Sequence, residues 1–148
     1  MIIKKIKLSR GNGITITASK SSNGKTSEIT LHSEELPAPE LLAALEKAGE
    51  IAVKICELPK KSEVKVRGIS MSYHGEDQTP AVIITITKEL SIGNTSITIN
   101  TPLKYLEEGE KIVDSSILEE EEATIIENIL EEGKKYLDGV REQTDLFS

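Results

Sequence analysis

Hydrophobic and polar residues alternate along the first third of the chain, which is the pattern of strands that bury one face. The alternation covers residues 2–8, 14–18 and 28–32. Segments rich in glycine and asparagine separate these runs at residues 10–13 and 22–25, and such segments form hairpin turns. The pattern therefore predicts three antiparallel strands joined by two hairpins.

Apolar residues then recur at the spacing of a helix with one buried face. Pro39 suits the first turn of a helix, and Leu58-Pro59 ends the run. The predicted helix has roughly 19 residues and a length of about 28 Å at ~1.5 Å per residue. Its apolar positions are Leu41, Leu42, Leu45, Ala48, Ala52 and Ile55.

The second half of the chain repeats the scheme with three more predicted strands, at residues 63–73, 81–87 and 95–99. In the first of them the inward positions change parity across Gly68, which indicates a β-bulge. The second is apolar on both faces, which predicts a central strand.

A second helix is predicted after an irregular stretch over residues 102–111. Ser116 and Glu119 have the spacing of a capping box, which marks a helix start. Glutamates at 119–122 fit the positive end of the helix dipole. An apolar stripe over 118–140 predicts that the helix continues to about residue 141.

These elements predict an α+β fold: an antiparallel sheet of about six strands with two helices packed on one face. The strands and helices divide into two β-meander-plus-helix halves, residues 1–59 and 60–141. We expect residues 1–141 to form a single domain and residues 142–148 to form a flexible C-terminal peptide.

The two halves also resemble each other in sequence. Residues 13–17 match residues 68–72, and residues 29–31 match residues 84–86 at the same offset. One interpretation of this similarity is an internal duplication. Short alternating strands also align by chance, so an unduplicated chain of the same fold class stays an alternative.

The charge of the chain argues against one class of function. Its 25 Asp and Glu outnumber 18 Lys and Arg, and the net charge is -7. An acidic protein repels the phosphate backbone of nucleic acids. Aromatic residues make up only 3% of the chain, which leaves few side chains that could stack on bases. We therefore expect no strong direct binding to nucleic acid.

Basic residues nevertheless gather near the N-terminus, at Lys4, Lys5, Lys7, Arg10 and Lys20. Two interpretations fit them. They form a basic strip on the first hairpin, or they are lysines of an edge strand that prevent aggregation.

Several features predict a cytoplasmic protein without a membrane partner. The single cysteine, Cys56, cannot form a disulfide within the chain, which favours a reducing compartment. Residues 1–8 lack the apolar core of a secretory signal, and no run approaches the ~20 apolar residues that span a bilayer. The sequence shows no recognised spacing of metal ligands, so no metal or cofactor is expected.

Two histidines, His32 and His74, each end a predicted strand and precede a polar loop. They are surface residues in one interpretation. In the other, the two loops lie at a shared edge of the sheet and form a ligand pocket. No catalytic motif is visible, although an active site built from residues far apart in the sequence would leave none.

The C-terminal residues point to a partner. Phe147 is the only phenylalanine of the chain and follows Leu146 and Asp145. An aromatic residue beyond the last regular element is more typical of a docking anchor than of a core residue. The alternative is that Leu146 and Phe147 fold back onto the sheet as an apolar staple.

The segment Gln143-Thr144-Asp145-Leu146-Phe147 resembles the bacterial sliding-clamp-binding motif, whose pattern is Gln-Leu-Ser/Asp-Leu-Phe. Thr144 departs from the usual leucine at a tolerant position. The resemblance implies that Leu146 and Phe147 fill an apolar pocket of the clamp and that Gln143 bonds at its rim.

The whole chain is also similar to small uncharacterised proteins from phage and prophage replication and recombination regions. Pro39-Glu40-Leu41-Leu42 and Lys135-Tyr136-Leu137-Asp138-Gly139 carry this similarity. It implies a phage origin and a role near DNA metabolism, but no particular activity. Together with the C-terminal peptide, it leads us to expect a non-catalytic accessory protein of DNA replication or recombination, in the cytoplasm of a bacterial host cell, that docks on the sliding clamp. The alternative is a homo-oligomeric protein that binds or sequesters a nucleotide-like molecule, for example against host defence. Exposed strand edges favour a homodimer.

Overall fold

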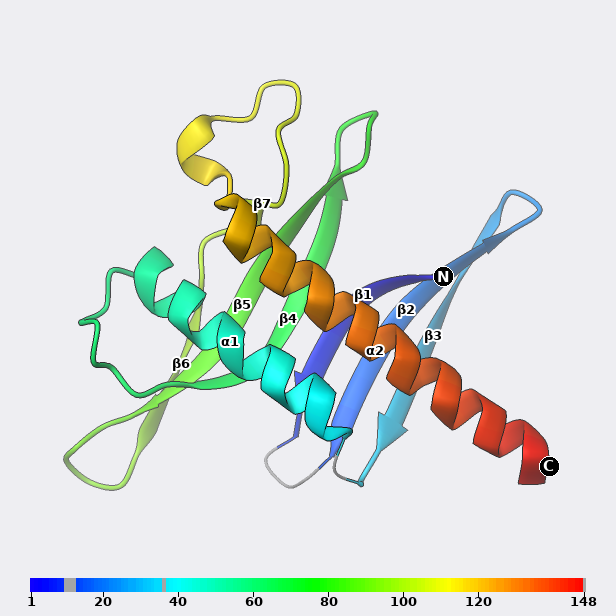
Figure 1. Ribbon diagram of the computed structural model, residues 1–148, viewed down its shortest axis with the longest axis horizontal. Coiled ribbons are helices and arrows are strands. Elements are labelled where there is room, and N and C mark those ends of the chain that lie inside the picture. Colours follow the sequence, from blue (N-terminus) through cyan, green and yellow to red (C-terminus); the bar gives the residue numbers. More distant parts are fainter. Residues whose placement is uncertain (10–12, 36, 148) are drawn as a thin grey trace.

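The protein has two layers, an antiparallel sheet and a pair of helices that cover one face of it (Figure 1). The computed structural model describes residues 1–9, 13–35 and 37–147, with side chains described as far as Gly139. This architecture confirms the predicted α+β class. In the described part of the chain, no helix has an apolar stretch long enough to cross a membrane.

The sheet contains seven strands in the order β3-β2-β1-β4-β5-β6, with β7 paired to β5. The first meander is formed by β1 (Ile2–Leu8), β2 (Ile14–Ser22) and β3 (Lys25–Ser33). The second is formed by β4 (Lys65–His74), β5 (Thr79–Glu89) and β6 (Ser96–Asn100). The two meanders meet where β1 pairs with β4 in the middle of the sheet.

The short strand β7 (Lys104–Tyr105) lies in the stretch that was predicted to be irregular. It forms because Lys104 and Tyr105 pair with Val82 and Ala81 of β5. This pairing joins residues more than 20 positions apart, so the local sequence pattern contains no signal for it.

Two helices cross over the sheet, α1 (Pro39–Ile55) and α2 (Glu120–Phe147). The first agrees with its predicted start at Pro39. The second was predicted to begin directly after Ser116 and to end at about residue 141. In the structure it begins at Glu120 and ends at Phe147. The backbone of residues 142–147 therefore continues α2, while the side chains of this segment lie outside the described part of the chain.

The predicted capping box at Ser116 is wrong. A 3-10 helix, η1 (Asp114–Ser116), precedes α2, and the Ser116 hydroxyl donates to the carbonyl oxygen of Val113 at 2.7 Å. The side chain that caps α2 is Glu122, whose carboxylate accepts from the backbone N–H of Glu119 at 3.0 Å. The local sequence could not distinguish between Ser116 and Glu119, three residues apart, as the residue before the first turn of the helix.

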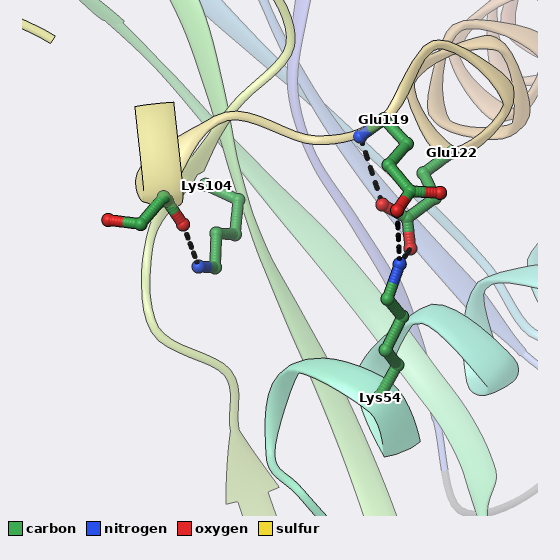
Figure 2. A network of polar contacts seen from close by, with 5 residues as sticks. Lys54, Lys104, Glu119 and Glu122 are labelled. Atoms are coloured by element: carbon green, nitrogen blue, oxygen red, sulfur yellow. Dashed lines mark hydrogen bonds and ion pairs between the residues drawn. The ribbon is translucent and has the colours of Figure 1, made fainter. Parts of the chain in front are cut away.

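An ion pair fixes the start of α2 against the end of α1 (Figure 2). The ammonium group of Lys54 lies 2.9 Å from Glu119 Oε1 and 3.4 Å from Glu122 Oε2. The hydrogen bond to Glu119 raises the pKa of Lys54. Close by, Lys104 donates to the backbone carbonyl of Ser115 at 2.7 Å, which ties β7 to η1.

The core lies between the sheet and the helices and is built from aliphatic side chains. Register places Ile6 beside Ile16 on one side and Ile69 on the other, and Ile69 beside Ile84. All four are at most 1% exposed. Gly133 lets α2 approach β1, because a Cβ at this position would come within 2.8 Å of Ile6 Cδ1.

The predicted bulge at Gly68 is confirmed, since the pairing of β4 with β5 shifts register between Val66 and Gly68. The edge-strand interpretation of the N-terminal lysines is wrong, because β1 lies between β2 and β4. Residues 10–12, which include Arg10, lie outside the described residues.

The residue match that suggested a duplication does not follow the topology. By position in the sheet, β1 corresponds to β4 and β2 corresponds to β5. The matched segments instead pair β2 with β4 and β3 with β5. An internal duplication stays a hypothesis, with the mirrored order of the two meanders as its structural argument.

Candidate functional site

The face of the sheet that points away from the helices is polar and hollowed. Because side chains alternate along a strand, Lys5 and Lys7 point to this face while Ile6 between them is buried under the helices. The hollow has a volume of about 990 Å³ and draws its lining from β1, β4, β5 and β6, with Thr15 from β2. We call this surface the open face.

Register aligns one row of residues across six strands of the open face. The row consists of His32, Thr15, Lys7, Gly68, Thr85 and Asn100. Side chains at both ends of it are held by hydrogen bonds. Thr15 Oγ1 lies 2.9 Å from His32 Nδ1, and Thr85 Oγ1 donates to Asn100 Oδ1 at 2.6 Å.

Four cations line the hollow, Lys5 and Lys7 from β1 and Lys65 and Arg67 from β4. Arg67 is the extra residue of the bulge, between Val66, which faces the core, and Gly68. The bulge thus turns its guanidinium toward the side where the lysines lie. Among the described residues that line the hollow, Glu89 is the only carboxylate.

The charge of this surface is opposite to that of the whole chain, which carries a net charge of -7. The many glutamates lie mostly elsewhere, with Glu119 to Glu122 at the start of α2. A cationic hollow in an acidic protein concentrates its attraction for anions at one place.

Besides Glu89 and a few aliphatic residues, the remaining lining consists mainly of neutral groups that can hydrogen-bond. Hydroxyl and amide side chains come from Ser70 on β4, Thr85 and Thr87 on β5, and Thr98 and Asn100 on β6. The cations therefore lie on β1 and β4, while most of the hydroxyl and amide groups lie on β5 and β6. The described lining contains no aromatic ring, so this surface is suited to phosphates and hydroxyl groups rather than to base stacking.

The structure does not bring the two predicted site histidines together. His32 lies on the edge strand β3 opposite Thr15, whereas His74 ends β4, three strands away in the sheet order and at the opposite end of the sheet. His74 lines a smaller hollow of about 680 Å³ with Asp77 and Tyr105. The imidazole ring of His74 and the ring of Tyr105 are arranged edge to face, with their centroids 5.6 Å apart. The Nε2 atom of His74 lies 2.7 Å from Ser72 Oγ.

Other groups with potential chemistry lie apart from the open face. Cys56 follows α1, is half-buried, and has its pKa raised by burial. Burial also raises the pKa of Tyr73, whose ring lies 4.7 Å from the Lys4 ammonium. In the described part of the chain, no group of three or more His, Cys, Asp or Glu could hold a metal ion.

The residues of the predicted docking peptide, Gln143, Asp145, Leu146 and Phe147, belong by their backbone to the last turns of α2. Figure 1 shows this end of the helix running past the sheet, with the C-terminus at its tip. Their side chains lie outside the described part of the chain.

Sequence reasoning missed most of the open face. It identified Lys5 and Lys7 as basic residues but not Lys65, Arg67 or their neutral neighbours on β5 and β6. A signal was present, because alternation places these cations on the polar side of their strands. These cations come together only because β1 pairs with β4, which joins residues more than 60 positions apart.

Comparisons with known protein families, with curated proteins and with solved structures find no match to this chain.

Proposed function

We propose that the protein binds a small phosphate-bearing ligand on the open face. The observation that carries the proposal is the gathering of four cations against one carboxylate in a hollow of an otherwise acidic chain. Guanidinium and ammonium groups form charge-assisted hydrogen bonds with phosphate oxygens. The volume of about 990 Å³ lies in the range of small-molecule sites.

The division of the lining suggests how such a ligand lies. Its phosphate group would meet Lys7, Lys65 and Arg67 on the β1–β4 side. A neutral part with hydroxyl or amide groups would then extend over Thr85 and Asn100 toward β6. A nucleotide has this combination of a charged end and a neutral polar body.

A small ligand fits better than a nucleic acid strand. A long strand would extend beyond the hollow and meet the acidic remainder of the protein, which repels it. The described lining also offers no aromatic platform for bases. This function belongs to the class of nucleotide-like binding considered from the sequence, but with the open face in place of the His32 and His74 loops.

Calorimetric titration with ATP and with inorganic triphosphate tests the proposal. The double variant Lys7→Gln/Arg67→Gln removes two cations from the hollow and should weaken binding at least tenfold, because each charge-assisted contact contributes about 1.5–3 kcal/mol. The matched control is Lys47→Gln/Lys60→Gln, two exposed lysines outside the lining. It makes the same change in net charge and should leave the affinity unchanged. Equal weakening by both double variants, or no binding by the unaltered protein, would refute the proposal.

Docking on a bacterial sliding clamp is the second candidate function. It is supported by the match of Gln143, Asp145, Leu146 and Phe147 to the clamp-binding motif and by the position of their backbone at the projecting end of α2. Two adjacent apolar anchors could supply most of the energy of such an interaction. The protein would then be an accessory factor of phage replication or recombination.

Titration into purified bacterial sliding clamp tests this second function. We expect micromolar binding that is lost in Leu146→Ala/Phe147→Ala and kept in Leu90→Ala/Ile92→Ala, which removes two exposed apolar side chains elsewhere. If the unaltered protein gives no heat of binding, the peptide is not a clamp ligand, and the interpretation of Leu146 and Phe147 as an apolar staple takes its place. This result leaves ligand binding on the open face unaffected, because the two functions use different residues.

A further inference from the structure

The outer strand β6 presents unpaired backbone groups at one edge of the sheet. The N–H of Thr101 donates to Ile84 at 2.9 Å and the N–H of Leu90 donates to Thr95 at 2.8 Å, so residues 95 and 101 bond toward β5. Because bonding direction alternates along an antiparallel strand, the backbone N–H and C=O groups of Ser96, Thr98 and Asn100 point outward.

This edge has none of the usual protection against pairing. Charged residues and proline commonly block exposed edges, but β6 has the sequence Ser-Ile-Thr-Ile-Asn and contains neither. Ile97 is 42% exposed on it, and Ile92 in the adjoining turn is 86% exposed. The other edge strand, β3, carries Lys25 and Glu28. The two edges of the sheet therefore differ in how readily they accept another strand.

We propose that β6 pairs with β6 of a second copy of this chain, antiparallel and around a two-fold axis at Thr98. In this register Thr98 faces Thr98 of the second copy, and Ser96 faces its Asn100. Each of the three residues then donates and accepts one backbone hydrogen bond, so every outward group at this edge is satisfied.

Side chains also match in this register. Ile97 lies opposite Ile99 of the second copy, in a pair without direct hydrogen bonds, where side chains approach most closely. Ile99 packs against the core on the helix side of the sheet, and Ile97 lies on the same side. The pairing therefore joins the apolar sides of the two copies and covers the exposed surface of Ile97.

The dimer would also connect the two open faces. Ser96, Thr98 and Asn100 form the β6 border of the hollow, so the same residues of the second copy continue this border without a break. The inference does not depend on ligand binding, because the edge and its self-complementarity exist without a ligand.

Analytical ultracentrifugation of the full chain over micromolar to millimolar concentrations tests the dimer. We expect the average mass to rise with concentration from that of the 16.2 kDa chain toward twice this value. Thr98→Pro removes an outward N–H and leaves the bonds to β5 intact, and Thr98→Lys places two like charges at the axis. Each should raise the dimer dissociation constant at least tenfold. Thr30→Lys makes the same change on the edge strand β3 and should have no effect.

Amide hydrogen exchange supplies an independent readout. Protection of the Ser96, Thr98 and Asn100 amides from exchange should rise with protein concentration. Circular dichroism should show that the Thr98 and Thr30 variants keep the fold. A monomer at all concentrations would overturn the proposal. So would a dimer that survives both Thr98 variants, or one that Thr30→Lys abolishes.

Discussion

A Cβ atom on Gly68 would overlap the backbone carbonyl oxygen of Ile6, because the paired strands β1 and β4 leave no room for a side chain at this point. Gly68 also lies opposite Lys7 and ends the bulge that carries Arg67. One glycine thus permits both the junction of the two meanders and the gathering of cations on the open face.

Gly68→Ala should destabilise the protein. The overlap is with backbone, which cannot rotate away, so we expect a loss of roughly 2 kcal/mol or more in the free energy of unfolding. Urea denaturation measures it. Gly139→Ala is the control: nothing lies within 4 Å of its Cβ position, and alanine in an exposed helix should stabilise by about 1 kcal/mol. Equal stability of both variants would contradict the close approach of β1 and β4.

Glu122→Ala should loosen the start of α2. The substitution removes the acceptor for the Glu119 N–H and one carboxylate beside Lys54. Loss of a helix cap costs about 1 kcal/mol, which thermal unfolding would detect. Glu121→Ala, at an exposed neighbouring position, should change stability little. Recovery in Glu122→Gln would assign the effect to the cap hydrogen bond, since glutamine keeps the acceptor without the charge.

Cys56 should react slowly with iodoacetamide at pH 8. Burial raises its pKa above the ordinary value of 9.0, so less of the reactive thiolate is present in the folded protein than in the unfolded chain. The folded form holds this proton more tightly, so the associated stability is present below pH 9 and is lost as the pH rises through the folded pKa. Alkylation followed by mass spectrometry should show faster reaction in urea. An equal rate in the folded state would mean that the thiol is fully solvated.

Ligand binding on the open face should weaken with salt. The attraction between the four cations and a phosphate group is screened by added ions. Raising NaCl from about 50 to about 500 mM should therefore reduce the affinity for ATP roughly several-fold or more. Adenosine lacks phosphate and serves as the comparison, because any binding of it should be insensitive to salt. An affinity for ATP that does not change with salt would exclude the cations as its main contacts.

Local pattern was sufficient for most of the individual elements. Alternation located five of the first six strands and a run apolar on both faces located β5, because the central strands bury their apolar side chains under the helices. The parity change at Gly68 located the bulge. Pro39 marked the start of α1 for a reason confined to its own ring, which fixes the backbone angle of a first helical turn. The Asn23-Gly24 turn follows from positive φ at both residues, 53° and 76°, which asparagine and glycine tolerate.

Features that depend on distant contacts could not be read in this way. Lys7 was compatible with an edge strand or with a basic surface until its pairing opposite Gly68 placed β1 at the centre of the sheet. The Glu119 and Glu122 carboxylates at the start of α2 likewise lie beside Lys54 of α1, a partner more than 60 positions away that no local pattern identifies.

The class of the fold, the two meander-and-helix halves and the peptide that resembles a clamp-binding motif could all be predicted from the amino-acid sequence. These follow from periodicity and from short contiguous segments. Three features became visible only in the folded chain: the cations of β1 and β4 share one surface, His32 and His74 do not, and β6 is an uncharged edge. Each of these depends on which strands become neighbours, and this is set by burial of the whole apolar face at once rather than by any single segment.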